Sequence, residues 1–179
     1  MDQQEKTIRS EDIYSGKILN LRIDRVSIPN GNQAEREIVE HSGGVCILAV
    51  TDNNRILLVE QFRKPVEGNL LELPAGKLEK DEDPLECAKR ELVEETGYQA
   101  ESVEYLFSFH TSPGYSNEII HLYLASDMEE VGVDPDENEI IINHQLEKKD
   151  IMKMISTGKI KDSKTIIGLL YYLAVDSDA

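Results

Sequence analysis

Short runs of apolar residues, separated by turn-forming sequences, are spaced as in β-strands along most of the chain. Residues 18–24 (ILNLRID) alternate apolar and polar positions, the turn signal PNGN follows, and residues 34–41 (AEREIVEH) predict a returning strand. Between them VSI shifts the alternation by one residue, which predicts a β-bulge. We therefore predict an N-terminal β arm at residues 1–41 and a main domain at residues 42–179.

The main domain shows a mixture of strand and helix patterns. Residues 43–50 (GGVCILAV) are continuously apolar, which is typical of a strand covered on both faces. Further strands are predicted at residues 55–62, 70–76, 103–109, 119–125 and 139–145. Helices are predicted at residues 84–96, 147–158 and 163–175, the last with Ser163 as its N-cap. This order favours a mixed α/β sandwich over a repeating βαβ fold.

The helix predicted at residues 84–96 has clear boundary signals. Asp83 opens a capping box with Glu86 three residues later, and Pro84 occupies the first helical position, where a missing N–H has no cost. Gly97 suits the position just after the helix.

The acidic residues of this helix lie in an unusual place. Glu91, Glu94 and Glu95 are three and four residues apart, so they share a face and repel one another. The apolar stripe of the helix consists of Leu85, Ala88 and Leu92. At helical spacing the three carboxylates border this stripe, whereas a solvated charge run would lie opposite it. Carboxylates so placed indicate a bound cation, and oxygen ligands favour Mg²⁺ or Mn²⁺ over zinc.

Charge and composition limit the partners of the chain. Its 179 residues carry a formal net charge of −16, which disfavours nucleic acid and anionic membranes as partners. No apolar run is long enough for a membrane span, and the N-terminus lacks the apolar region of a signal peptide. The two cysteines, Cys46 and Cys87, are far apart, which favours a reduced cytoplasmic protein. The scattered histidines show no ligand spacing and are interpreted as structural.

One motif is specific enough to indicate a family. Gly76, Glu82 and the run RELVEETGY at residues 90–98 resemble a complete Nudix box, G-x5-E-x7-R-E-U-x-E-E-x-G-U, where U is a bulky apolar residue. Every fixed position is filled at the fixed spacing. The resemblance implies a Nudix-type α/β/α sandwich around a mixed sheet, and an enzyme that hydrolyses a nucleoside diphosphate linked to another group.

The resemblance also implies roles for individual residues. Glu91, Glu95 and the carbonyl oxygen of Ala75 would be metal ligands. Arg90 would brace the glutamates, and Glu82 would support the loop before the helix.

Segments outside the box resemble the ADP-ribose pyrophosphatase subfamily. In TSPGYSNE, Pro113 lies sixteen residues after Gly97 as in that subfamily, and the resemblance assigns Pro113 and Gly114 to substrate binding. EQFRKPV resembles a strand end whose Arg63 would hold a phosphate. REIVEHSGGVCIL resembles the start of the main domain, with Arg36 near the adenine or the diphosphate.

The N-terminal arm carries a further implication of the resemblance. In this subfamily the arm often exchanges between the subunits of a homodimer, so each active site borrows residues from its neighbour. Relatives commonly stack the adenine on an aromatic residue of the arm. Here Tyr14 is the aromatic residue of the arm, which leaves the adenine contact open.

The implied reaction is hydrolysis of ADP-ribose to AMP and ribose 5-phosphate with two or three Mg²⁺ ions, Mn²⁺ being the alternative. The segment DPDENEIII resembles the mobile E-x-E loop of the family. It implies Glu137 as the general base and Glu139 as an additional metal ligand. If this segment is only an acidic turn, Glu94 becomes the candidate base.

Three alternatives are open at this point. Another nucleoside diphosphate sugar, such as GDP-mannose, differs from ADP-ribose in its base, whose pocket the motifs do not define. A non-catalytic Nudix fold that senses a nucleotide usually loses box glutamates, and this chain keeps all of them. An RNA-directed pyrophosphatase is disfavoured by the acidic charge.

Overall fold

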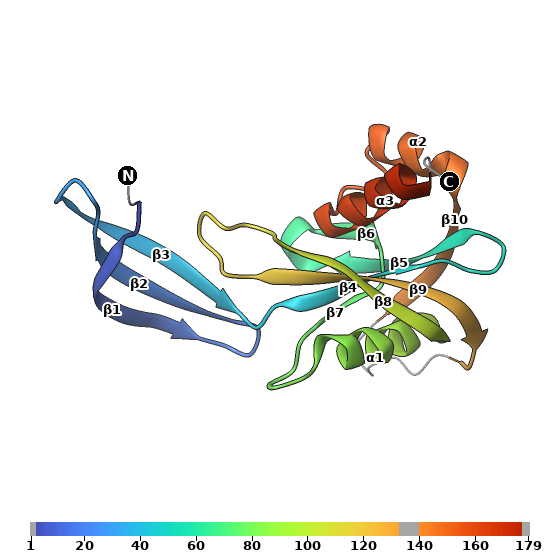
Figure 1. Ribbon diagram of the computed structural model, residues 1–179, viewed down its shortest axis with the longest axis horizontal. Coiled ribbons are helices and arrows are strands. Elements are labelled where there is room, and N and C mark those ends of the chain that lie inside the picture. The colour runs from blue at the N-terminus through green and yellow to red at the C-terminus, as the bar shows by residue number, and fades with distance from the viewer. Residues whose placement is uncertain (1–2, 133–139, 177–179) are drawn as a thin grey trace. The chain divides into compact units, whose positions relative to one another are not determined.

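The computed structural model describes residues 3–132 and 140–176 and contains strands, short 3₁₀ turns and three α-helices (Figure 1). The strands are β1 (Lys6–Ser15), β2 (Leu19–Ser27), β3 (Gln33–His41), β4 (Gly44–Ala49), β5 (Arg55–Arg63), β6 (Gly68–Glu72), β7 (Ala75–Lys77), β8 (Tyr98–His110), β9 (Ile119–Glu130) and β10 (Ile141–Glu147). The helices are α1 (Pro84–Thr96), α2 (Ile151–Ser156) and α3 (Ser163–Asp176), with 3₁₀ turns at Lys64–Val66 and Lys148–Asp150.

The chain divides into two compact units. The first consists of Met1–Gly43 and His110–Ile119, and the second of Gly44–Phe109 and Ile120–Ala179. The domains proposed at residues 1–41 and 42–179 stay a prediction. The first unit adds to the arm a segment from the loop between β8 and β9.

The first unit is an antiparallel sheet in the order β1-β2-β3. The segment His110–Ile119 joins β3 through backbone hydrogen bonds from Val39 N to Tyr115 O at 2.7 Å and from Asn117 N to Val39 O at 3.2 Å. The strand β1 was not predicted from the sequence, because its residues are exposed throughout and show no apolar alternation.

The bulge predicted at VSI does not lie in β2, whose pairing with β3 continues without a register shift to Ser27. The register between β1 and β2 does shift beside Val26, but the extra residue belongs to β1, between Thr7 and Arg9. The apolar alternation is interrupted because a polar residue, Asp24, takes one of the buried positions of β2. Val26, two residues later on the same face, is buried as well. The Asp24 carboxylate accepts hydrogen bonds from the Ser10 hydroxyl and the Arg22 guanidinium, which allow it to be buried. The Ser10 hydrogen bond is also the main reason that the pKa of Asp24 is lowered.

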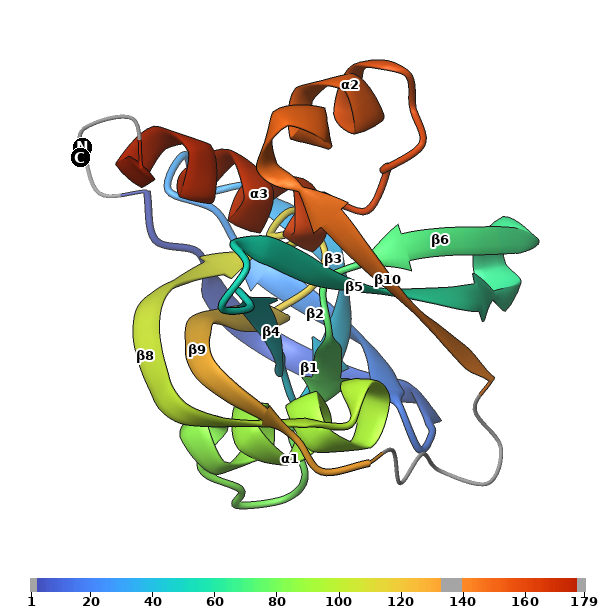
Figure 2. The ribbon, with the colours of Figure 1, turned by 90° about the vertical axis from the view of Figure 1, so that its right-hand side faces the viewer.

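The second unit contains the predicted mixed α/β sandwich, and that prediction is confirmed. One sheet has the order β7-β4-β9-β8, with β4 parallel to β9 and antiparallel to β7. A second, antiparallel sheet has the order β10-β5-β6. Figure 2 shows α1 on one side of these sheets and α2 and α3 on the other.

The central strand β4 is buried on both faces, as its continuous apolar run predicts. Val45, Ile47 and Ala49 pack in the core that includes Leu92 of α1. Cys46 and Leu48 pack in the other core, which includes residues of α2 and α3. Alternate residues of one strand therefore serve two cores.

Some predicted boundaries differ from the structure. The strand predicted at residues 70–76 is split into β6 and β7, because Pro74 has no N–H for the ladder and its carbonyl accepts from Ile47 N at 2.8 Å. The helix predicted at residues 147–158 is shorter, because Glu147 still pairs with Arg55 in the ladder of β10 and β5 and a 3₁₀ turn follows. Ser163 is not the N-cap of α3.

Asp162 takes the capping position of α3 in place of Ser163. Its carboxylate accepts a hydrogen bond from Thr165 N at 2.9 Å, and its carbonyl accepts from Ile166 N at 3.0 Å. The cap therefore lies one residue before the predicted one.

Among the residues that the structure describes, no helix is long and apolar enough to cross a membrane. Cys46 and Cys87 are both free and buried.

Candidate active site

The helix α1 begins and ends at the predicted residues. The Asp83 carboxylate accepts from Leu85 N at 2.8 Å and from Glu86 N at 3.4 Å, so it caps the first turn. Gly97 ends the helix in the left-handed conformation, with φ of 77°, and donates its N–H to Val93 O. The predicted span Pro84–Thr96 is confirmed. It could be predicted because these signals act within a few residues.

The acidic residues border the buried stripe of α1, as helical spacing predicts. Ala88 and Leu92 are buried, and Glu95 is only 5% exposed. The Glu91 side chain is 14% exposed and that of Glu94 is 40% exposed. Exposure to solvent therefore increases along one face of the helix, from Glu95 at the edge of the core to Glu91 and then Glu94.

The strand β7 lies directly against these carboxylates. Ala75 N donates to Glu95 Oε2 at 2.9 Å. At Gly76, a Cβ atom would lie 1.8 Å from Glu91 Cδ, so any side chain there would displace the carboxylate. Glycine at this position therefore leaves the room that the Glu91 carboxylate occupies.

Arg90 lies among three carboxylates. Its Nε and Nη2 donate to the two oxygens of Glu82 at 3.0 and 3.2 Å, and its Nη1 donates to Glu91 at 2.8 Å and Glu94 at 2.9 Å. The Arg90 hydrogen bonds are the main reason that the pKa of Glu82 is lowered to about 2, and Glu82 in turn holds the pKa of Arg90 above its usual range. Glu82 also accepts from Glu79 N at 2.8 Å, which ties the preceding loop to the helix.

The guanidinium of Arg90 also donates to Cys87 Sγ at 3.3 Å. Burial raises the pKa of the Cys87 thiol to about 12. This thiol therefore stays protonated at neutral pH and is not a nucleophile.

The arginines predicted to bind substrate each pair with a glutamate. Arg63, at the end of β5, donates from Nε and Nη2 to the two oxygens of Glu72 at 2.8 and 2.9 Å. Arg36, in the arm, donates to Glu5 at 3.0 and 2.6 Å. Glu5 raises the pKa of Arg36. The substrate contacts of both arginines stay predictions.

Two other predicted groups lie apart from α1 in the chain. Pro113 and Gly114 are exposed in a turn of the first compact unit, where Tyr115 N and Ser116 N donate to Ser112 O. Glu137 and Glu139 lie outside the described residues.

Comparisons with known proteins now decide the family. The NUDIX domain family matches residues 40–153, and the nucleoside diphosphate sugar hydrolase N-terminal domain matches residues 5–39. The chain belongs to the Nudix family. It is a Nudix hydrolase with the N-terminal domain of the nucleoside diphosphate sugar hydrolases.

Relatives of this Nudix hydrolase have several names. The chain is 48% identical over 170 residues to the methanol dehydrogenase activator of Bacillus methanolicus and 44% identical over 170 residues to the ADP-ribose pyrophosphatase of Bacillus subtilis strain 168. Both alignments cover 94% of this chain and 92% of the relative. It is also 40% identical over 154 residues to the GDP-mannose pyrophosphatase of Yersinia enterocolitica, covering 79% of this chain and 80% of the relative.

A solved structure shows the same fold. It is described as the crystal structure of an ADP compounds hydrolase and superposes with a TM-score of 0.83 at 19% sequence identity. The alignment covers 94% of this chain and 91% of that chain.

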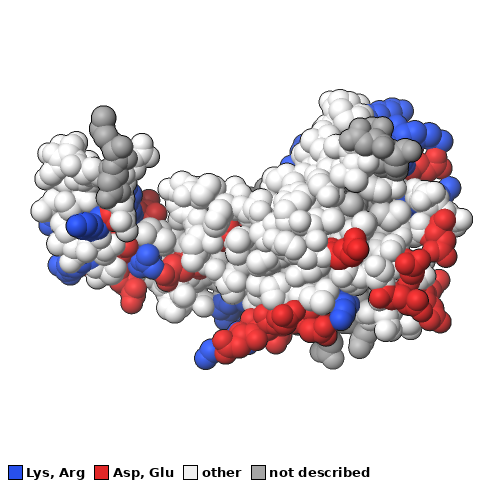
Figure 3. Space-filling view, in the orientation of Figure 1, with Lys and Arg blue, Asp and Glu red and all other residues white. Residues whose placement is uncertain are grey.

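The carboxylates on α1 are the type of donor that a divalent metal needs, and enzymes of this family generally use such a metal. Oxygen donors on one helix face are the ligands that a hard cation prefers, and the absent side chain at Gly76 lets the Glu91 carboxylate lie against β7. Figure 3 shows the acidic side chains gathered over α1 and the loop before it. Within the described part of the chain, no group of three His, Cys, Asp or Glu residues is arranged to hold a metal. The carboxylates of Glu82, Glu91 and Glu94 instead accept hydrogen bonds from Arg90.

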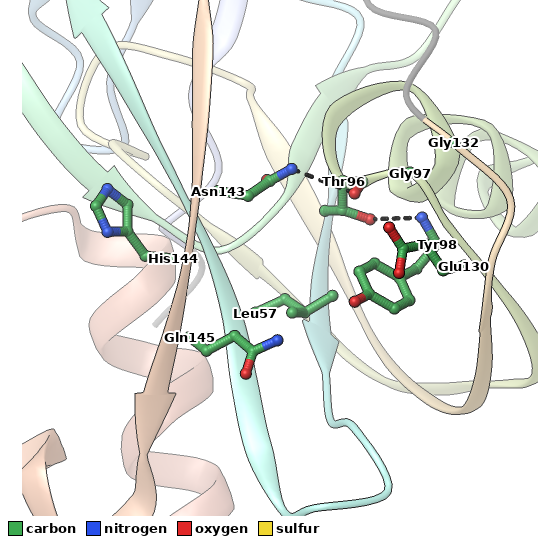
Figure 4. A pocket seen from close by; sticks show the side chains of 9 residues that line it. All are labelled: Leu57, Thr96, Gly97, Tyr98, Glu130, Gly132, Asn143, His144 and Gln145. Carbon is green, nitrogen blue, oxygen red and sulfur yellow. Dashed lines mark hydrogen bonds between the residues drawn. The ribbon is translucent and has the colours of Figure 1, made fainter.

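A pocket of about 270 Å³ lies beside the C-terminal end of α1 (Figure 4). Leu57 and Tyr98 contribute apolar surface, and Glu130 is a charged residue of the lining. Asn143 of β10 reaches across to donate to Thr96 O at 3.2 Å. The pocket therefore marks where β10 and the end of β9 meet α1, and it does not include the carboxylates that Arg90 binds.

Sequence reasoning missed two charged residues of the Nudix hydrolase, Glu72 and Lys164. Glu72 is 2% exposed and forms ion pairs with Arg63 and Lys164. A carboxylate inside the apolar run LLELPAG was the one available signal, because a charge at a buried strand position needs a partner.

Proposed function

We propose that this Nudix hydrolase cleaves the diphosphate bond of ADP-ribose, releasing AMP and ribose 5-phosphate. The observation that carries the proposal is the row of carboxylates on α1, set against Gly76 and beside Arg90, in a chain whose arm matches the nucleoside diphosphate sugar hydrolases. ADP-ribose is favoured over GDP-mannose because the relative named for it aligns over more of the chain and at higher identity.

The proposed metal is Mg²⁺, as two or three ions, with Mn²⁺ as the alternative. Glu91, Glu95 and the Ala75 carbonyl would hold it, and when bound it neutralises the diphosphate and activates water. The net charge of −16 makes such neutralisation necessary, since the substrate is itself an anion. The two buried free cysteines are consistent with a reducing compartment, and we propose a cytoplasmic location.

The protein side chains would supply position and proton transfer. Water attacks one phosphorus in line, and the other phosphate leaves with its sugar. Arg90 and Glu82 would hold the carboxylates in place, because their hydrogen bonds connect the helix to its preceding loop. Arg63 and Arg36 would bind the diphosphate or the base, and the turn at Pro113 and Gly114 would contact the substrate. These residues correspond to the substrate-binding positions that the resemblance implies.

The first test is a hydrolysis panel of ADP-ribose, GDP-mannose, NADH, diadenosine polyphosphates and 8-oxo-dGTP with Mg²⁺. We expect ADP-ribose to have the highest kcat/KM, measured by release of AMP. GDP-mannose is the runner-up because of the relatives named for it. If GDP-mannose were hydrolysed about tenfold faster, it would replace ADP-ribose as the substrate. Binding without any turnover would instead support the nucleotide-sensing alternative.

The second test concerns the proton acceptor, which we assign to Glu137, with Glu139 as an additional metal ligand. The described residues on either side of this segment support the assignment. Val131 N and Gly132 N donate to Gly97 O at 2.8 and 3.1 Å, and Asn143 on the other side bonds to Thr96 O. The described residues on both sides of the segment therefore contact the C-terminal end of α1.

Glutamine substitutions separate the two roles. Glu137→Gln should lower kcat at saturating Mg²⁺ with little change in metal affinity, because a base acts on the water and does not hold the ion. Glu139→Gln should weaken Mg²⁺ binding only when substrate is present. Both are measured by Mg²⁺ titration of the rate. If neither variant lowers kcat by more than about threefold, the base is Glu94.

The third test concerns assembly, for which we propose a homodimer whose arms exchange between subunits. The arm exposes large apolar side chains, including Ile8 at 52%, Ile13 at 48% and Ile18 at 67%. A sheet of three strands cannot bury such residues alone, and a second copy of the chain would cover them. Deleting residues 1–40 should abolish both dimerisation and activity. Light scattering that finds the intact chain to be a fully active monomer would contradict the proposal.

A further inference from the structure

Glu72 is a carboxylate buried in the core of the second compact unit. It ends β6, is 2% exposed and lies beside fully buried Leu73. Burial of an ionised carboxylate costs several kcal/mol unless it is paired and hydrogen-bonded. Burial alone would raise the pKa of Glu72, yet the hydrogen bonds and charges of Arg63 and Lys164 lower it. The carboxylate is therefore held in its charged form by two cations.

The two cations contact Glu72 in different ways. Arg63 uses its Nε and Nη2 in a two-pronged contact with both carboxylate oxygens, and Lys164 donates to Oε2. The Lys164 side chain is 15% exposed, whereas that of Arg63 is 38% exposed. Lys164 is thus an internal counter-charge, and Arg63 extends from the same carboxylate toward solvent.

The start of α3 fixes the position of Lys164. Its Nζ lies 3.1 Å from the carboxylate of Asp162, the N-cap of the helix. The buried hydroxyl of Thr165 donates to Asp162 at 2.6 Å and accepts from Leu73 N at 2.8 Å. Although burial lowers the pKa of Lys164, the charges of Asp162 and Glu72 raise it, so the lysine stays cationic. The start of α3 is therefore joined to the end of β6 by hydrogen bonds at Glu72 and at the next residue, Leu73.

This arrangement leaves one edge of the Arg63 guanidinium for a ligand. Glu72 takes Nε and Nη2, and among residues 3–132 and 140–176 no partner is seen for Nη1, which bears two N–H groups. Residues 61 and 63 share a face of β5. Within the same described residues, Gln61 Oε1 is buried and has no hydrogen-bond partner. Because an amide oxygen does not donate to a phosphate, the donors that this face supplies to an anion come from Arg63.

We propose that Glu72 and Lys164 are positioning residues that orient the Arg63 guanidinium toward the diphosphate of the substrate. Glu72 holds the fork of Arg63 in one pose, so less side-chain freedom is lost when a phosphate binds. Lys164 neutralises Glu72, so the charge of Arg63 is left for the anion. The proposal rests on the proposed function only in taking a nucleoside diphosphate sugar as the ligand.

The test is calorimetric titration of the full-length protein with ADP-ribose in EDTA, where binding is measured without hydrolysis. The variants are Glu72→Gln, Lys164→Met and Lys164→Arg, with Lys161→Met as the control. Lys161 is exposed three residues before Lys164, so its replacement changes the net charge equally. Calorimetry separates the two relevant effects, since an unfolded fraction lowers the stoichiometry and a misplaced arginine raises Kd.

We expect Glu72→Gln and Lys164→Met each to raise Kd about tenfold or more, the cost of a lost charge-assisted contact. Lys164→Arg keeps the positive charge, so its Kd should stay within about threefold of the wild-type value. The Kd of Lys161→Met should differ from the wild-type value by less than about twofold. The glutamine variant is decisive, because removing a negative charge near an anion site would tighten binding if net charge alone mattered. A Kd for Glu72→Gln equal to or below that of the wild type overturns the proposal.

Two further outcomes have a defined meaning. If Glu72→Gln does not fold, Glu72→Asp gives the same test: its shorter side chain withdraws the carboxylate from Arg63 at constant charge, and Kd should again rise. A wild type that binds ADP-ribose but does not hydrolyse it with Mg²⁺ contradicts the proposed function and leaves the positioning role supported by the Kd shifts. If GDP-mannose binds in place of ADP-ribose, the same comparison applies to its diphosphate. Binding of neither compound overturns the positioning proposal, and the hydrolysis panel with Mg²⁺ decides the proposed function separately.

Discussion

Replacing Glu91 or Glu95 by glutamine should lower kcat by roughly a hundredfold or more while the fold is kept. A glutamine retains the shape of the side chain but loses the charge that holds a divalent cation, and the metal contributes several kcal/mol to transition-state stabilisation. The fold should survive because the carboxylates on this face repel one another. At Glu95 the amide oxygen of glutamine can still accept the hydrogen bond from Ala75 N.

The matched control for this prediction is Glu86→Gln. Glu86 is on the same helix, its side chain is 65% exposed, and it pairs with Lys89, away from Arg90. This variant should keep kcat within about twofold, since a surface pair of this kind contributes little. Steady-state kinetics with an Mg²⁺ titration, after chelator treatment and metal return, measure the effect. Wild-type rates in either Glu91→Gln or Glu95→Gln would rule out these residues as metal ligands.

Replacing Gly76 by alanine should abolish most of the activity with little change in stability. The new Cβ would lie 1.8 Å from Glu91 Cδ, so the two cannot keep their positions. The Glu91 carboxylate is the end of a flexible side chain and can move, whereas the backbone of β7 is held in the ladder with β4. Alanine therefore displaces the proposed metal ligand and leaves the sheet in place.

We expect Gly76→Ala to lower kcat about a hundredfold and to change the free energy of unfolding by about 1 kcal/mol or less. The control is Gly68→Ala, because a Cβ there meets only Val66 O, at an ordinary 3.7 Å. Activity assays and thermal unfolding of both variants provide the comparison. Full activity of Gly76→Ala would show that the Glu91 position is not required, and an unfolded variant would show that the carboxylate cannot move aside.

Local signals explain why α1 could be predicted to the residue. The cap at Asp83, the proline after it and the glycine at 97 act through hydrogen bonds within a few residues, so each is visible in the sequence. The burial of Glu95 beside Leu92 also follows from helical spacing alone. In contrast, β1 could not be predicted, since an exposed strand has no apolar alternation to reveal it.

The sequence by itself determined the mixed α/β sandwich, the helix Pro84–Thr96 and the face of that helix on which the carboxylates lie, because these depend on periodicity and caps. Only the tertiary structure decided the partners of charged residues far apart in the chain. Lys164 meets Glu72 across 92 residues, and Glu95 meets Ala75 N across 20. Such contacts depend on which strands and helices pack together, and a buried charge reveals its need for a partner without revealing which residue supplies it.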